Sequence, residues 1–98
     1  MFRVKKSIPV EADLQGYIHF ASRMYQKLDS KGQKRVRELC AEAGGEYHQA
    51  LFEFVTTDAG AVAVCCRYYI SQSTLERIVR KYYIAFAKSL HKGRGKNG

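Results

Sequence analysis

Residues 70–86 carry two superimposed patterns that restrict what this chain can fold into. One is a set of apolar residues at helical spacing: Leu75, Ile78, Val79, Tyr82 and Phe86. The other is a polar and basic set that the same helix would turn to its opposite side: Gln72, Ser73, Glu76, Arg77, Arg80 and Lys81. Together they predict an amphipathic helix that packs one face on a small core and offers the other to a partner.

The beginning of this helix is marked by two possible caps. The Ser71 hydroxyl could accept a hydrogen bond from an orphan backbone N–H, and Ser73 with Glu76 has the spacing of a capping box. The sequence leaves open which serine caps the helix. In both cases the amide-rich end of the helix lies near Gln72, where phosphate groups are attracted.

Positive charge is concentrated in the part of the chain that contains this helix. The net charge of the whole chain is +8. Residues 61–98 carry eight Lys and Arg against the single acid Glu76, a net of +7. Residues 1–60 carry nine basic and eight acidic side chains, a net of +1. Such an asymmetry is the electrostatic signature of a protein that binds a polyanion, and a basic surface kept only for solubility would not require it.

The residues around Ser71 add a recognisable spacing. The small residue Cys65 is followed four positions later by Tyr69, at a position suited to a turn. An aliphatic residue and a serine come next, then a Thr-aliphatic pair and an isoleucine: Ile70, Ser71, Thr74, Leu75 and Ile78. This spacing, within residues 62–83, resembles the helix-turn-helix motif of DNA-binding regulators of bacteria, phages and integrative mobile elements. The chain departs from that family at Tyr69, because the family often has Gly there and a bulky residue with positive φ is disfavoured.

The resemblance implies sequence-selective binding of double-stranded DNA by the helix that follows Ser71. Base contacts are expected from Gln72, Ser73 and Arg77, because Gln can read adenine and Arg can read guanine through paired hydrogen bonds. Phosphate contacts are expected from hydroxyl and basic side chains around them: Arg67, Ser71, Arg80, Lys81, Lys92 and Arg94. A lone domain of this size usually reads DNA as a dimer, so a homodimer is a possible state.

The rest of the chain has the spacing of further helices. We expect helices over residues 11–28, 31–43, 46–55 and 59–69, with Asp29 or Ser30 capping the second and Gly44-Gly45 ending it. Thr56-Thr57-Asp58 could cap the fourth. The expected inner residues of the fourth helix are Val62, Cys65, Cys66 and Tyr69.

The fold predicted from these elements is all-α. About five helices form one domain over residues 1–90, with a helix-turn-helix at about residues 59–83 and a flexible basic tail at residues 91–98. The alternative is an α+β fold with a hairpin at residues 50–69, because residues 61–69 are rich in β-branched and aromatic side chains.

Neither an enzyme nor a metal- or cofactor-binding protein is expected. The three histidines are dispersed, and none has catalytic or metal-ligand spacing to a carboxylate or a thiol. The three cysteines lack C-x-x-C spacing and are expected to pack as small hydrophobes. No apolar run approaches the ~18–20 residues of a membrane span, and the first residues do not resemble a signal peptide. We therefore expect a cytoplasmic protein without a membrane partner.

Four functions remain open at this point. A transcriptional regulator of a phage or mobile element would bind a promoter, whereas an excision or recombination accessory factor would bind an attachment site. A helical protein-interaction module would dock its aromatic residues on a partner and would not bind DNA. An RNA binder would use its tyrosines and its tail.

Overall fold

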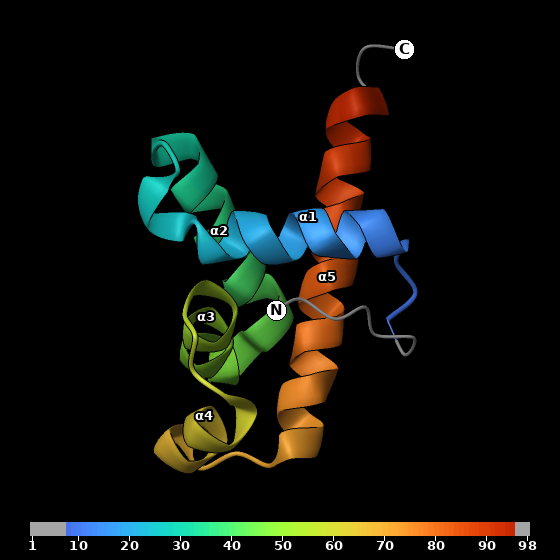
Figure 1. Ribbon diagram of the computed structural model, residues 1–98. Coiled ribbons are helices and arrows are strands. Elements are labelled where there is room, and N and C mark those ends of the chain that lie inside the picture. The colour runs from blue at the N-terminus through green and yellow to red at the C-terminus, as the bar shows by residue number, and fades with distance from the viewer. Residues whose placement is uncertain (1–7, 96–98) are drawn as a thin grey trace.

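The computed structural model describes residues 8–95, and all regular structure among them is helical (Figure 1). The α-helices are α1 (Ala12–Arg23), α2 (Ser30–Gly44), α3 (His48–Thr56), α4 (Ala61–Tyr68) and α5 (Gln72–Gly95). Two short 3-10 helices are η1 (Tyr25–Lys27) and η2 (Gly45–Tyr47). The all-α prediction is confirmed. The alternative hairpin at residues 50–69 is wrong, because α3 and α4 occupy that stretch.

Helix α5 is the element on which the others pack. It contacts α1, α2, α3 and α4, and Figure 1 shows it running the height of the molecule with α1 lying across it. The apolar stripe predicted for it is entirely buried: Leu75, Ile78, Val79, Tyr82 and Phe86. The Tyr82 hydroxyl lies 2.6 Å from the Ser22 hydroxyl of α1. Burying this stripe therefore both builds the core and fixes which face of α5 meets solvent.

Helix α2 begins and ends as its sequence predicts. The Asp29 carboxylate accepts a hydrogen bond of 2.8 Å from the Gly32 N–H, so Asp29 and not Ser30 is the cap. The helix ends at Gly44, and Gly45 follows with a φ of +56°, a conformation that favours glycine. The first predicted helix is shorter than expected, because α1 ends at Arg23 and residues 25–27 form η1.

Of the four inner residues predicted for α4, only Cys65 is buried. Val64 and Cys65 are in the core, whereas Val62 is 63% exposed and Cys66 and Tyr69 are also exposed. The helix is only eight residues long and has valines on both sides, so local spacing did not decide which side packs on α3 and α5. The predicted cap is also wrong. The N-cap is Gly60 and makes no side-chain hydrogen bond, while the Thr57 hydroxyl donates back to the Glu53 carbonyl at 2.7 Å.

Residues 8–95 include no helix that combines the length and the hydropathy required to cross a lipid bilayer.

Candidate nucleic-acid interface

The turn between α4 and α5 is closed by backbone hydrogen bonds. The Tyr69 and Ile70 N–H groups both donate to the Cys65 carbonyl, the latter at 3.1 Å. Tyr69 has φ 57° and ψ 47°, which is the left-handed conformation that glycine usually supplies at a helix end. Its side chain is 94% exposed, so the ring packs on almost nothing. The bulky residue is therefore accommodated without changing this left-handed type of helix end.

Ser71 begins α5. Its hydroxyl oxygen accepts a hydrogen bond of 3.1 Å from the Thr74 N–H and lies 2.9 Å from the Thr74 hydroxyl, to which it donates. Its carbonyl accepts from the Leu75 N–H at 3.0 Å. The sequence offered two serines as the possible N-cap of this helix. Ser71 is the cap, and Ser73 lies within the helix. The capping bond fixes the first turn of α5, and with it the position of Gln72 and Ser73.

The outward face of this helix start is exposed and basic. Every residue of the predicted polar face is exposed: Gln72, Ser73, Glu76, Arg77, Arg80 and Lys81. Ser73, Arg77 and Arg80 follow one another at i, i+4 and i+7, so they form a single row along α5. Within the described part of the chain, the three cations of this face form no ion pair. We call Tyr69 and Ser71 together with these six residues the α4–α5 surface.

Arg67 differs from Arg80 and Lys81, two other predicted phosphate contacts, because it already has an ion-pair partner. It lies on α4 and forms an ion pair with Glu53 of α3, whose other carboxylate oxygen accepts from the Tyr68 hydroxyl at 2.9 Å. Burial raises the pKa of Glu53, but the hydrogen bonds from Arg67 and Tyr68 and the charge of Arg67 outweigh it, so the pKa lies below its ordinary value. Arg67 could therefore reach a phosphate either by sharing its guanidinium between the two anions or by leaving this carboxylate.

The structure does not bring Lys92 and Arg94 close to the start of α5. Both residues lie in the last turns of the helix, which extends to Gly95, so residues 91–95 are helical where a flexible tail was expected. With ~1.5 Å of rise per residue, they are about 30 Å from Gln72 along the helix axis. Their side chains, and residues 96–98 of the expected tail, lie outside the described part of the molecule.

Two residues of this region were not foreseen from the sequence. Tyr69 was expected to point inward, but it stands exposed beside the start of α5. Glu53 was not considered, although it holds both Arg67 and Tyr68. The left-handed turn could have indicated the outward direction of Tyr69, whereas Glu53 lies 14 residues before Arg67 and nothing local connects the two.

The described side chains bring together no group of three His, Cys, Asp or Glu residues able to hold a metal ion. The chain matches no protein-family model, and comparisons with curated proteins and with solved structures return no match. Its function must therefore be inferred from its own residues.

Proposed function

We propose that this protein binds double-stranded DNA with sequence preference, and that α4, the turn at Tyr69 and α5 act as a helix-turn-helix. The observation that carries the proposal is the α4–α5 surface. A capped helix start presents short polar side chains, then three cations without an ion-pair partner among the described residues, while its apolar face is buried. Amides at a helix start and nearby cations both favour the phosphates of a duplex.

In the proposed complex the start of α5 enters the major groove, which is wide enough to admit an α-helix. Gln72, Ser73 and Arg77 then face the base edges, and Gln and Arg are the side chains that read adenine and guanine through paired hydrogen bonds. Helix α4 crosses the backbone in the manner of the first helix of the motif. The buried stripe of α5 keeps these side chains in one register with respect to the groove.

Phosphate contacts would come from Arg80 and Lys81, one turn further along α5, and from the Ser71 end of the helix. Tyr69 adds an exposed hydroxyl at the turn, a group that also contacts phosphate in protein–DNA interfaces. Arg67 would join them, either by sharing its guanidinium with Glu53 or by leaving it. Lys92 and Arg94 lie too far along α5 to contact the same phosphates. They would contact a phosphate further along the duplex, or the DNA bound by a second copy of the chain.

The biological setting that we propose is a cytoplasmic transcriptional regulator of a phage or mobile element. An accessory factor for excision or recombination is the nearest alternative, and it would use the same surface. A footprint in a promoter would support the first role, and a footprint in an attachment site would support the second.

A helical protein-interaction module is a second candidate, because α1 has an exposed apolar row. Tyr17 and Phe20 of α1 and Met24, the residue that follows it, stand at i, i+3 and i+7, and each is more than half exposed. Such a row could dock a partner protein, or the second copy of a DNA-binding homodimer. DNA binding is favoured because the row on α1 does not account for the concentration of positive charge on residues 61–98.

The test is a titration of the full chain with a pool of duplexes and with RNA at two salt concentrations. A DNA reader should lose affinity steeply with salt, because bound counterions are released from the phosphates, and it should enrich particular duplex sequences. The double variant Arg80→Ala/Lys81→Ala should weaken binding to all duplexes. Lys34→Ala/Arg35→Ala removes the same charge from an exposed pair on α2 and should leave binding nearly unchanged.

Two results would contradict the proposal. One is equal weakening by the two double variants, which would mean that only the net charge matters. The other is the absence of duplex binding at low salt, with capture of the chain by a protein through α1 instead.

A further inference from the structure

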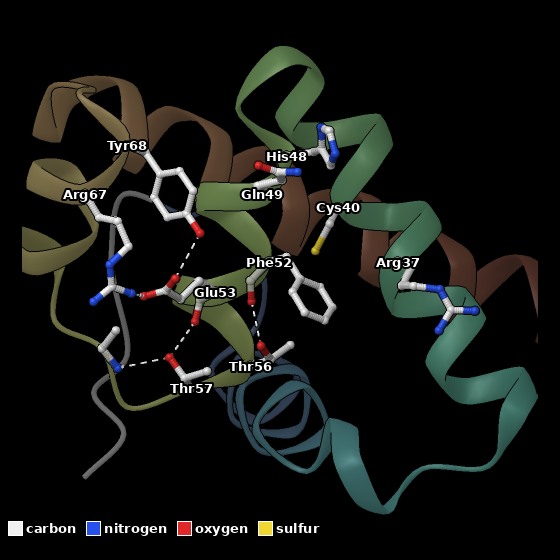
Figure 2. A pocket seen from close by; sticks show the side chains of 11 residues that line it. Arg37, Cys40, His48, Gln49, Phe52, Glu53, Thr56, Thr57, Arg67 and Tyr68 are labelled. Atoms are coloured by element: carbon white, nitrogen blue, oxygen red, sulfur yellow. Dashed lines mark hydrogen bonds and ion pairs between the residues drawn. The ribbon is translucent and has the colours of Figure 1, made fainter.

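A cavity in the described part of the molecule lies between α2, α3 and α4. It is an open cleft of about 740 Å³, a volume within the range of small-molecule sites, which is roughly 300–1,000 Å³. Figure 2 shows its lining, with Arg67 and Arg37 on opposite sides and Phe52 and Glu53 between them. Arg67 is the one predicted DNA contact in this lining, and the proposed DNA binding gives the rest of the cleft no role.

The inner part of the cleft is apolar and aromatic. The Phe52 ring meets Tyr25 edge-on, with ring centroids 5.0 Å apart, so its orientation is fixed by a neighbour. The Cys40 thiol lies beside it, and burial raises the pKa of this thiol to about 12. Cys40 is therefore neutral and a poor nucleophile at neutral pH, and at 2% exposed it forms part of the apolar floor behind Phe52. A flat aromatic group would find a matching surface here.

The charged groups around this apolar part leave one positive charge uncompensated. Glu53 is neutralised by Arg67, and both of its oxygens are already engaged by Arg67 and Tyr68. Arg37 donates to the Tyr25 hydroxyl at 2.7 Å but forms no ion pair with any described residue. Because Arg37 and Phe52 both contact Tyr25, the guanidinium and the apolar ring are held near each other.

We propose that this cleft binds a small aromatic carboxylate of one or two rings. The ring system would lie on Phe52, with Cys40 in the floor behind it, and the carboxylate would accept hydrogen bonds from the N–H groups of Arg37 that Tyr25 does not use. Arg suits this role because its planar fork matches the geometry of a carboxylate. A neutral ligand of the same shape would leave the charge of Arg37 without a counter-ion. The site does not depend on the proposed DNA binding.

The test is a calorimetric titration of the full chain, without nucleic acid, with naphthalene-2-carboxylate and with its neutral counterpart naphthalene-2-methanol. The carboxylate should bind about tenfold more tightly, a difference of about 1.4 kcal/mol. Arg37→Gln should reduce the affinity for the carboxylate to that for the alcohol. Arg35→Gln, an exposed arginine of the same helix outside the cleft, is the matched control and should change neither affinity.

A second variant tests the apolar part of the site. Phe52→Leu should weaken both ligands together, because it removes the ring and keeps the charge. Equal affinity of the unmodified protein for the carboxylate and the alcohol would overturn the proposal without any variant. Absence of binding at millimolar ligand, or equal losses in Arg37→Gln and Arg35→Gln, would overturn it as well.

Discussion

Replacing Tyr69 by glycine should make this protein more stable, although it deletes a large aromatic side chain. A non-glycine residue in the left-handed conformation costs about 1–2 kcal/mol, and Tyr69 has that conformation at φ 57°. Glycine removes this cost but adds about 0.4–1 kcal/mol of chain entropy to the unfolded state. Because Tyr69 is 94% exposed, deleting its ring removes almost no packing contacts. The removed strain exceeds the added entropy, so the free energy of unfolding should rise by about 0.5–1 kcal/mol.

Urea unfolding of Tyr69→Gly measures this difference, and the melting temperature should rise by roughly 2–8 °C for a domain of this size. Tyr69→Ala is the matched control, because it deletes the ring and keeps the Cβ atom that causes the strain. Its free energy of unfolding should stay within about 0.5 kcal/mol of the unmodified protein. If the glycine variant proved no more stable than the alanine variant, the proposed strain at this turn would be refuted.

Three further predictions concern the core. Leu75→Ala should lower the free energy of unfolding by about 2–5 kcal/mol, because Leu75 is 2% exposed; a loss below 1 kcal/mol in urea titrations would contradict its place in the core. Tyr82→Phe should cost about 1 kcal/mol by removing the 2.6 Å contact with Ser22, and a gain in stability would contradict it. Burial raises the pKa of Tyr83 from 10.0 and that of Cys40 from 9.0, both to about 12, so their stabilisation should be complete at pH 8 and be lost as the pH rises from 9 to 12. Each group should contribute about 1.4 kcal/mol per pH unit to that loss. Tyr83→Phe should make the loss less steep in unfolding measured at pH 8 and pH 10.5, and an unchanged slope would count against its burial.

The parts of the fold that could be predicted from sequence are those that local spacing determines. The stripe of α5 repeats over several turns, and only one helix face can bury it. The Asp29 cap and the glycines after α2 act on neighbouring backbone groups, so their effect is visible within a few residues. The Ser71 cap was one of two local candidates, and the hydrogen bond to the Thr74 N–H distinguishes it from Ser73.

The parts that could not be predicted depend on contacts between distant segments. Helix α4 offers apolar residues on two sides, and α3 and α5 determine that Val64 is buried and Val62 is not. In and directly after α1, the apolar Tyr17 and Met24 are exposed, while the polar residues Gln15 and Ser22 of α1 are buried.

Those two polar residues can pack inside because each has hydrogen-bond partners, Gln15 in the residues before α1 and Ser22 both in α1 and in α5. The Gln15 amide donates to the carbonyl of Val10 at 2.9 Å, and Ser22 lies against Tyr82, 60 residues away. Buried polar groups need such partners, and a pattern of hydrophobic spacing does not contain them. The pairing of Arg67 with Glu53 was missed for the same reason.

The most direct test of the proposed DNA reading is the effect of Arg77→Ala on discrimination between duplexes. Dissociation constants would be measured at one salt concentration for the best duplex selected by the unmodified protein and for a scrambled duplex of equal composition. If Arg77 reads a base, the variant should lose about 1–3 kcal/mol on the selected duplex and much less on the scrambled one. Arg80→Ala should weaken both duplexes equally. An equal loss on both duplexes for Arg77→Ala as well would show that α5 does not read sequence through this residue.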